Sequence, residues 1–211
     1  MPPFLINTAA FQAYNLVIVW AEAHVDRNVA GRMMPVTWIL TLDGMMSIIG
    51  VLIALSVWRW LARQGREPDT MTKFATASVL VTFAYAILAW GAGLGGSSSS
   101  LVPLAILVLF FVVLDLNFGW VNPPGCAFVS RFAPARLGTT LMSVNLLAAA
   151  GFSNIAVGWL GRFYEPLGAV DFWWLNAGIA ASGGAAAMAL RPVIARLLYD
   201  QERTALVAVP A

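Results

Sequence analysis

The chain has 211 residues, of which 60% are hydrophobic and only 10% are charged, and its net charge is +2. A soluble domain carries about 25% charged residues, so a water-soluble globular fold would have to cover more apolar surface than these charges allow. The small net charge and the lack of a dense basic run exclude a nucleic-acid partner from our expectations. A single cysteine, Cys126, excludes an internal disulfide.

Six apolar runs follow one another along the chain, separated by polar or turn-forming clusters. They cover residues 4–21, 34–58, 74–90, 101–121, 137–160 and 172–190. About 20 apolar residues suffice for a helix to cross a bilayer, and isolated strands cannot cross without closing a barrel, whose alternating pattern is absent. We predict an all-α integral membrane fold with about six transmembrane helices in one domain, residues 1–200, followed by a cytoplasmic tail, residues 201–211.

Basic residues are distributed unevenly over the predicted loops. Nine of the 12 Lys and Arg residues fall on one side, namely Arg59, Arg63, Arg66, Lys73, Arg131, Arg136, Arg191, Arg196 and Arg203. Arg27, Arg32 and Arg162 fall on the other side. Because cytoplasmic loops are enriched in Lys and Arg, both termini should face the cytoplasm, and a bacterial inner membrane fits this orientation. Residues 1–7 lack the positive charge that opens a signal peptide.

Two acidic residues lie inside the apolar runs. Asp43 follows the start of the second run by enough residues to lie about 13 Å deep at about 1.5 Å per residue, and Asp115 lies in the fourth run. Such residues usually face a bundle interior or an aqueous cavity, because a charge in lipid is costly. We therefore take Asp43 and Asp115 as candidates for proton coupling, with a fixed hydrogen-bonding role as the alternative.

Polar side chains also mark the first run and the end of the fourth. Gln12, Tyr14 and Asn15 suit a cavity lining, although polar groups in lipid also join neighbouring helices. Asn122 precedes Pro123-Pro124, which removes backbone donors and predicts a break in the fourth helix. Broken helices at membrane depth commonly line a cavity or form a gate, but the helix could equally end there.

Enzyme signatures are missing from the sequence. It contains no G-x-S-x-G, no H-E-x-x-H and no P-loop. One histidine, His24, and one cysteine leave little for a metal site, so no metal and no cofactor are expected. An intramembrane carboxylate protease would need Asp43 and Asp115 to meet, and nothing else in the sequence supports that activity. We expect a protein that is not an enzyme.

Several short motifs then follow in a fixed order. They are Val25-Asp26-Arg27-Asn28, Pro35-Val36-Thr37-Trp38 with Leu42-Asp43-Gly44, Arg66-Glu67-Pro68 with Lys73-Phe74, and Phe132-Ala133-Pro134-Ala135-Arg136 with Leu160-Gly161 and Tyr164. This series, from about residue 10 to residue 180, resembles the C-terminal half of a proton-dependent oligopeptide transporter of the major facilitator superfamily. The last segment is the strongest match, since it is similar to the family's K-L-A-P-x-R and its G-N-x-x-A-G-x-L-G-x-x-Y ending.

The chain departs from the family's pattern at two acidic positions. The family usually has a Glu in its seventh helix, where this chain has Tyr14-Asn15-Leu16. It usually has a second Glu, implicated in holding a peptide's amino end, where this chain has Phe118. Asp115 lies one turn from Phe118, and Asp43 stands where the family has Asn. Either aspartate could substitute for the missing carboxylates.

The resemblance implies one half of a major facilitator fold and, with it, a carrier that takes up di- and tripeptides or related small solutes together with protons. Candidate residues for the substrate cavity are Gln12, Tyr14, Asn15, Trp38, Phe118 and Asn122. Because the site of such folds lies between two six-helix halves, we expect the chain to need an N-terminal half as its partner in the bilayer. A six-helix channel subunit, or a membrane scaffold that does not transport, is the alternative.

Overall fold

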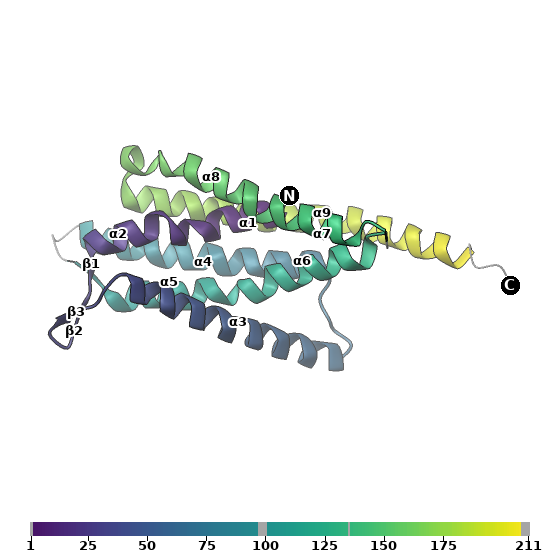
Figure 1. Cartoon of the computed structure of the whole chain (residues 1–211), viewed down its shortest axis with the longest axis horizontal. Helices are drawn as coiled ribbons and strands as arrows, with labels where there is room; N and C mark the ends of the chain where they lie inside the picture. The colour runs from purple at the N-terminus through teal and green to yellow at the C-terminus, as the bar shows by residue number, and fades with distance from the viewer. Residues whose placement is uncertain (1, 97–100, 135, 208–211) are drawn as a thin grey trace.

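The computed structural model describes residues 2–96, 101–134 and 136–207, which form an elongated bundle of helices (Figure 1). Six helical stretches in this part of the chain are long and apolar enough to cross a membrane. They are Pro2–His24, Thr37–Arg63, Thr70–Gly95, Leu104–Ser130, Gly138–Gly161 and Tyr164–Arg196. The predicted all-α membrane fold with six spans is therefore confirmed.

Several spans are made of more than one helical segment. The helices are α1 Pro2–Phe11, the 3₁₀ helix η1 Gln12–Tyr14, α2 Leu16–His24, α3 Thr37–Arg63, α4 Thr70–Gly96, α5 Leu104–Leu116, α6 Phe118–Phe132, α7 Gly138–Leu146, the π-helix η2 Leu147–Gly151, α8 Phe152–Gly161 and α9 Tyr164–Val207. The strands are β1 Val25–Asp26, β2 Asn28–Val29, β3 Arg32–Met33 and β4 Val102–Pro103. Strand β1 pairs with β4 in parallel and β2 pairs with β3 as a hairpin, at one end of the bundle.

The first span is interrupted in the middle by η1. Asn15, which follows η1, has a non-helical backbone with φ −114° and ψ −97°, and its N–H donates to the Gln12 carbonyl. Polar side chains in this region therefore sit where the helix changes direction. A broken helix at membrane depth occurs only where protein or a water-filled cavity surrounds it.

The sequence-based prediction of a break at Pro123-Pro124 was wrong, because the fourth span divides into α5 and α6 at Asn117, where the backbone is still helical with φ −65° and ψ −29°. The Asn117 side-chain amide donates to the Leu114 carbonyl, while the Asn117 carbonyl accepts from Trp120 N at 2.8 Å. These local bonds compete with the helical pattern, so α5 ends and α6 begins around this residue. Both prolines lie inside α6. Membrane helices tolerate proline because neighbouring groups satisfy the freed carbonyls.

The last helix begins earlier and ends later than its apolar run of residues 172–190. It starts at Tyr164 and turns at Gly168, whose φ of 75° is a conformation that favours glycine. It continues to Val207, so the predicted tail of residues 201–211 begins within α9. Residues 208–211 lie outside the described part of the chain.

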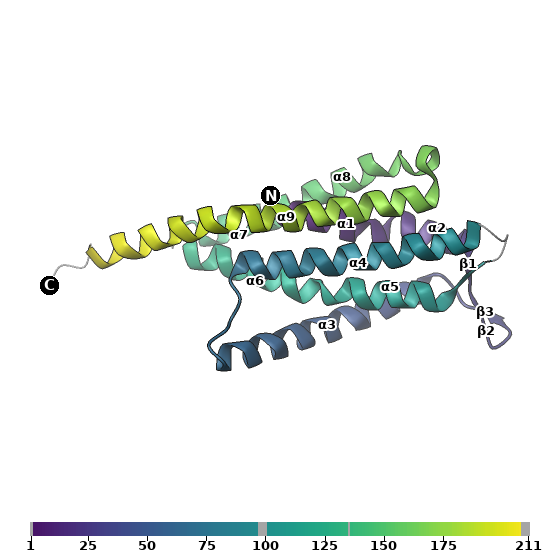
Figure 2. The same ribbon diagram turned by 180° about the vertical axis from the view of Figure 1, so that it is seen from behind.

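The core lies where α1, α4, α5 and α9 meet. The contact between α4 and α9 is the most extensive in the bundle, and Figure 2 shows these two helices side by side. Ring contacts link three fully or nearly fully buried aromatic side chains, because Trp173 packs edge-on against Trp20 and stacks near Tyr85. The Tyr85 hydroxyl donates to the Ala9 carbonyl at 2.7 Å, so this cluster is closed by a hydrogen bond to α1.

Two edges of the bundle leave apolar side chains uncovered. Helix α3 lies at one edge and packs mainly on α5 and α6, while α7 and α8 lie at the other edge (Figure 1). On α3 the exposed apolar residues include Leu40, Met45, Ile48, Ile49, Leu52 and Ile53, and on α7 to α8 they include Val144, Leu146, Leu147, Phe152, Ile155 and Trp159. Surfaces of this kind contact lipid or another apolar helix.

Helix α3 approaches α5 closely because Gly50 has no side chain. A Cβ atom built on Gly50 would lie 2.6 Å from the backbone oxygen of Asp115. At Gly44, which precedes Gly50 on the same helix, an added Cβ would meet nothing within 4 Å. The crossing of α3 and α5 therefore depends on a glycine at position 50.

We expect Gly50→Ala to lower the thermal stability of the protein. Alanine stabilises an ordinary helix interior by about 1 kcal/mol relative to glycine, but overpacking of a tight contact costs about 1–3 kcal/mol. The measurement is the midpoint of thermal unfolding in detergent or lipid nanodiscs. Gly44→Ala is the matched control and should leave the midpoint unchanged or raise it. Equal midpoints for the two variants would show that the crossing is not tight.

Candidate functional site

Asp43 and Asp115 come together in the folded chain. Asp43 lies on α3 and Asp115 on the last turn of α5, and the two carboxyl groups contact each other. Asp43 is 7% exposed and Asp115 is 3% exposed. Burial of two carboxyl groups is costly unless each is hydrogen-bonded or neutralised. The sequence identified both residues, and the structure brings them into one cluster.

Two hydroxyl groups hold this pair of carboxyl groups. The Tyr14 hydroxyl, from η1, donates to Asp43 Oδ1 at 3.1 Å, and the Ser47 hydroxyl, from α3, donates to Asp115 Oδ1 at 3.0 Å. We call Tyr14, Asp43, Ser47 and Asp115 the carboxyl cluster. It joins the first, second and fourth spans inside the membrane-spanning part of the bundle.

One atom of the carboxyl cluster has no donor. Asp115 Oδ2 is buried and accepts no hydrogen bond, and no Lys, Arg or His among the described side chains forms an ion pair with either aspartate. A buried acceptor without a donor costs about 1–3 kcal/mol. No described protein group donates to this oxygen.

The other candidate residues for the substrate cavity are spread over the bundle. Gln12 is fully buried, and its amide donates to the Val157 carbonyl of α8 at 3.1 Å, while Asn15 contacts Gln12. Trp38 is exposed near the start of α3. Phe118 is 45% exposed at the start of α6, and Asn122 is half-buried one turn further on. Of this set, the structure adds only Tyr14 to the carboxyl cluster.

Ser47 was missed by the sequence analysis. Serine is common in membrane helices as a packing or hydrogen-bonding residue, so its presence alone gave no signal. Its position four residues after Asp43 on the same helix was the available clue, because residues i and i+4 lie on one face.

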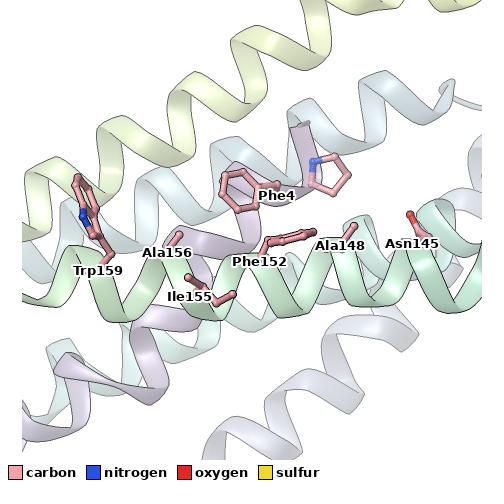
Figure 3. Close-up of a pocket in the computed structure, with 9 residues that line it drawn as sticks. Phe4, Asn145, Ala148, Phe152, Ile155, Ala156 and Trp159 are labelled. Carbon is pink, nitrogen blue, oxygen red and sulfur yellow. The ribbon is translucent and has the colours of Figure 1, made fainter.

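A large apolar cavity, whose lining includes no residue of the carboxyl cluster, lies between α1 and the α7–η2–α8 segment (Figure 3). Its volume is about 650 Å³. Its lining consists of Pro3, Phe4, Asn145, Ala148, Ala149, Phe152, Ile155, Ala156 and Trp159. Asn145 is the one polar side chain in this lining, and no lining residue titrates. The cavity therefore offers apolar contact and no chemistry.

A group of charges lies at the end of the bundle where α3 turns into α4. Lys73 pairs with Glu67 at 2.7 Å and lies over the Trp58 ring at 4.5 Å from its centroid. Asp69 accepts from Thr72 N at 2.9 Å, which caps α4, and pairs with Arg191 of α9 at 2.8 Å. These bonds join the α3–α4 turn to α9.

The same contacts set the acidity of Asp69. Partial burial acts to raise the pKa of this carboxyl, but hydrogen bonds from Thr72 and the charge of Arg191 outweigh burial and hold the pKa below its usual value. A lowered carboxyl pKa stabilises the fold at pH values above the pKa of the same carboxyl in the unfolded chain, and that stabilisation disappears as the pH falls through the lowered value.

The described residues contain no group of three or more His, Cys, Asp or Glu side chains that could hold a metal ion.

Comparison with known proteins finds similarity to a peptide transporter. No family model matches the sequence. The chain is 25% identical to the peptide transporter YePEPT of Yersinia enterocolitica over 145 residues, which are 68% of this chain and 28% of the relative. The chain therefore spans less than a third of the length of that relative.

Solved structures share the fold at higher coverage. A crystal structure of the peptide transporter POT in complex with sulfate is 25% identical, with a TM-score of 0.79, over 92% of this chain and 40% of that chain. A POT mutant in complex with alafosfalin has a TM-score of 0.80 at 24% identity, over 93% of this chain and 39% of that chain. The resemblance seen in the sequence is confirmed: the chain has the fold of one part of a POT family peptide transporter.

Proposed function

We propose that this chain is the C-terminal half of a secondary transporter that takes up di- and tripeptides, or related small solutes, together with protons. The observation that carries this proposal is the fold match over 93% of the chain, at a TM-score of 0.80, to a transporter of which the chain spans 39%. A carrier of this class places its site between two halves. The exposed apolar edges α3 and α7–α8 would then contact the other half.

The carboxyl cluster supports a coupling role over peptide hydrolysis. A protease that uses two aspartates must admit a water molecule and a peptide bond between them, whereas Asp43 and Asp115 are almost fully buried. An ionisable group inside a membrane span commonly belongs to an ion or proton pathway. Tyr14, which is 51% exposed and bonded to Asp43, connects the cluster to the surface of the bundle.

The experiment that tests this function measures uptake of a labelled dipeptide by liposomes. They contain this chain together with the N-terminal half of a transporter of the same family. An inward proton gradient should drive saturable uptake, and collapse of the gradient with an ionophore should abolish accumulation. Uptake that ignores the gradient would contradict proton coupling, and conductance without saturation would indicate a channel.

We further propose that both termini face the cytoplasm, with the protein in a bacterial inner membrane. The β2–β3 hairpin and the α3–α4 turn lie at opposite ends of α3 (Figure 1). Helix α3 has 27 residues, which span about 40 Å at about 1.5 Å per residue. After replacement of Cys126 by Ser, a cysteine at Val29 should react with an impermeant label from outside the cell. A cysteine at Gln64 should react only after the membrane is opened. Labelling of Gln64→Cys from outside would reverse the orientation.

A further inference from the structure

The hydrogen-bond donors of the carboxyl cluster do not reach all of its carboxyl oxygens. Tyr14 donates to Oδ1 of Asp43 and Ser47 donates to Oδ1 of Asp115. Each carboxyl group thus receives one hydroxyl hydrogen on one oxygen, while Oδ2 of Asp115 is buried without a donor. Besides Ser47, the Asp43 carboxyl contacts the Asp115 carboxyl, and Asp43 has no hydrogen to donate when it is ionised.

We propose that Asp43 and Asp115 form a single proton-binding site, in which one proton is shared between the two carboxyl groups. The shared proton supplies the missing donor, and it leaves one negative charge on the pair. Release of the proton to water leaves two carboxylates and two negative charges. Tyr14 and Ser47 are positioning residues, since each fixes one outer oxygen, Oδ1, and leaves Oδ2 of its carboxyl group for the shared proton.

Other titratable groups near the pair do not replace this proton. From η1 the pair faces Tyr14, and behind it Tyr85 of α4 interacts with Tyr14. From α3 and α5 the titratable groups are Asp43 and Asp115 themselves. No basic side chain among the described residues is paired with them. Hard metal cations take six or more oxygen ligands, whereas this cluster offers two carboxyl groups whose outer oxygens are already bonded.

The position of the site links its charge to helix packing. Asp115 lies at a close approach of α3 and α5, since its backbone oxygen faces Gly50. Two carboxylates on these helices would repel each other across that crossing, while the shared proton joins them. Helix α3 lies at the edge of the bundle and packs mainly on α5 and α6. Loss of the proton would therefore weaken the packing of α3 on α5.

This inference deepens the proposed function and rests on it for its biological meaning, but its test needs no transport. Infrared spectroscopy of the full chain in lipid nanodiscs detects protonated carboxyl groups by their C=O stretch. We expect the wild-type chain at neutral pH to show the C=O stretch of one protonated carboxyl group per chain. This band should disappear in a single titration step as the pH is raised. Asp43→Asn and Asp115→Asn should each remove the whole signal, because the remaining carboxylate no longer has a partner to share with. Asp171→Asn, on the exposed surface of α9, should leave it intact.

If one of the two variants, Asp43→Asn or Asp115→Asn, does not fold, the other alone shows whether the proton is shared. Ser47→Ala and Tyr14→Phe provide a second test, since each should keep the signal but shift its frequency through the lost hydrogen bond. A signal that persists in Asp43→Asn would show two independent groups and overturn the shared site. The absence of any protonated carboxyl at neutral pH would also overturn it, as would a signal displaced by sodium at constant pH. Loss of transport with an intact shared proton would instead contradict the proposed function alone.

Discussion

In the assembled transporter, Asp43→Asn should abolish accumulation driven by a proton gradient while counterflow exchange of substrate continues. Asparagine keeps the shape and polarity of the side chain but cannot bind and release a proton. Gradient-driven uptake should therefore fall to the level seen without a gradient, because the variant can only equilibrate the substrate across the membrane. The measurement compares the two transport modes in the same liposomes at several pH values.

Asp171→Asn is the control for this comparison, because Asp171 is exposed on α9 and lies outside the carboxyl cluster. It should retain both transport modes. If Asp43→Asn leaves the pH dependence of uptake unchanged, Asp43 is a structural partner of Tyr14. The coupling role would then pass to Asp115 or to the other half of the transporter.

Phe118→Glu should make the transporter select peptides with a free amino group. The family usually has a glutamate at this position, implicated in holding the amino end of a peptide, and Phe118 is exposed enough for a replacement to reach a substrate. We expect the wild type to distinguish little between a dipeptide and its N-acetylated form. The variant should prefer the free form by about tenfold, which corresponds to about 1.4 kcal/mol.

The matched control is Phe118→Gln, which adds polarity without charge. In this variant, the free dipeptide and its N-acetylated form should inhibit uptake of a labelled substrate to nearly the same extent. Strong selection for the free amino group by the wild type itself would contradict this account. Another carboxylate would then contact the substrate, and Asp115 would be the first residue to test.

Apolar length alone was sufficient to predict the six spans, because crossing a bilayer imposes one constraint on every helix. The helix ends were less predictable. Helix α3 continues to Arg63 and α4 begins at Thr70, both outside their apolar runs. Long basic side chains at helix ends reach the interface, so a helix can continue where its hydrophobicity stops.

The members of the carboxyl cluster were visible in the sequence, but their meeting was not. Asp43 and Asp115 were identifiable because acidic residues in lipid are costly. Their contact depends on the crossing of α3 and α5 at Gly50, which is a tertiary feature. The division between α5 and α6 at Asn117 was hidden for a different reason, since the asparagine side chain competes locally with the helix while the prolines gave the stronger sequence signal.

The most direct test of the central claim, that this chain is one half of a transporter, uses three liposome preparations. They contain this chain alone, a six-helix N-terminal half alone, or both together. We predict that the chain inserts in the bilayer in both preparations that contain it but moves no dipeptide by itself. Saturable, gradient-driven uptake should arise only when both halves are present. Saturable dipeptide uptake by this chain alone would contradict the account.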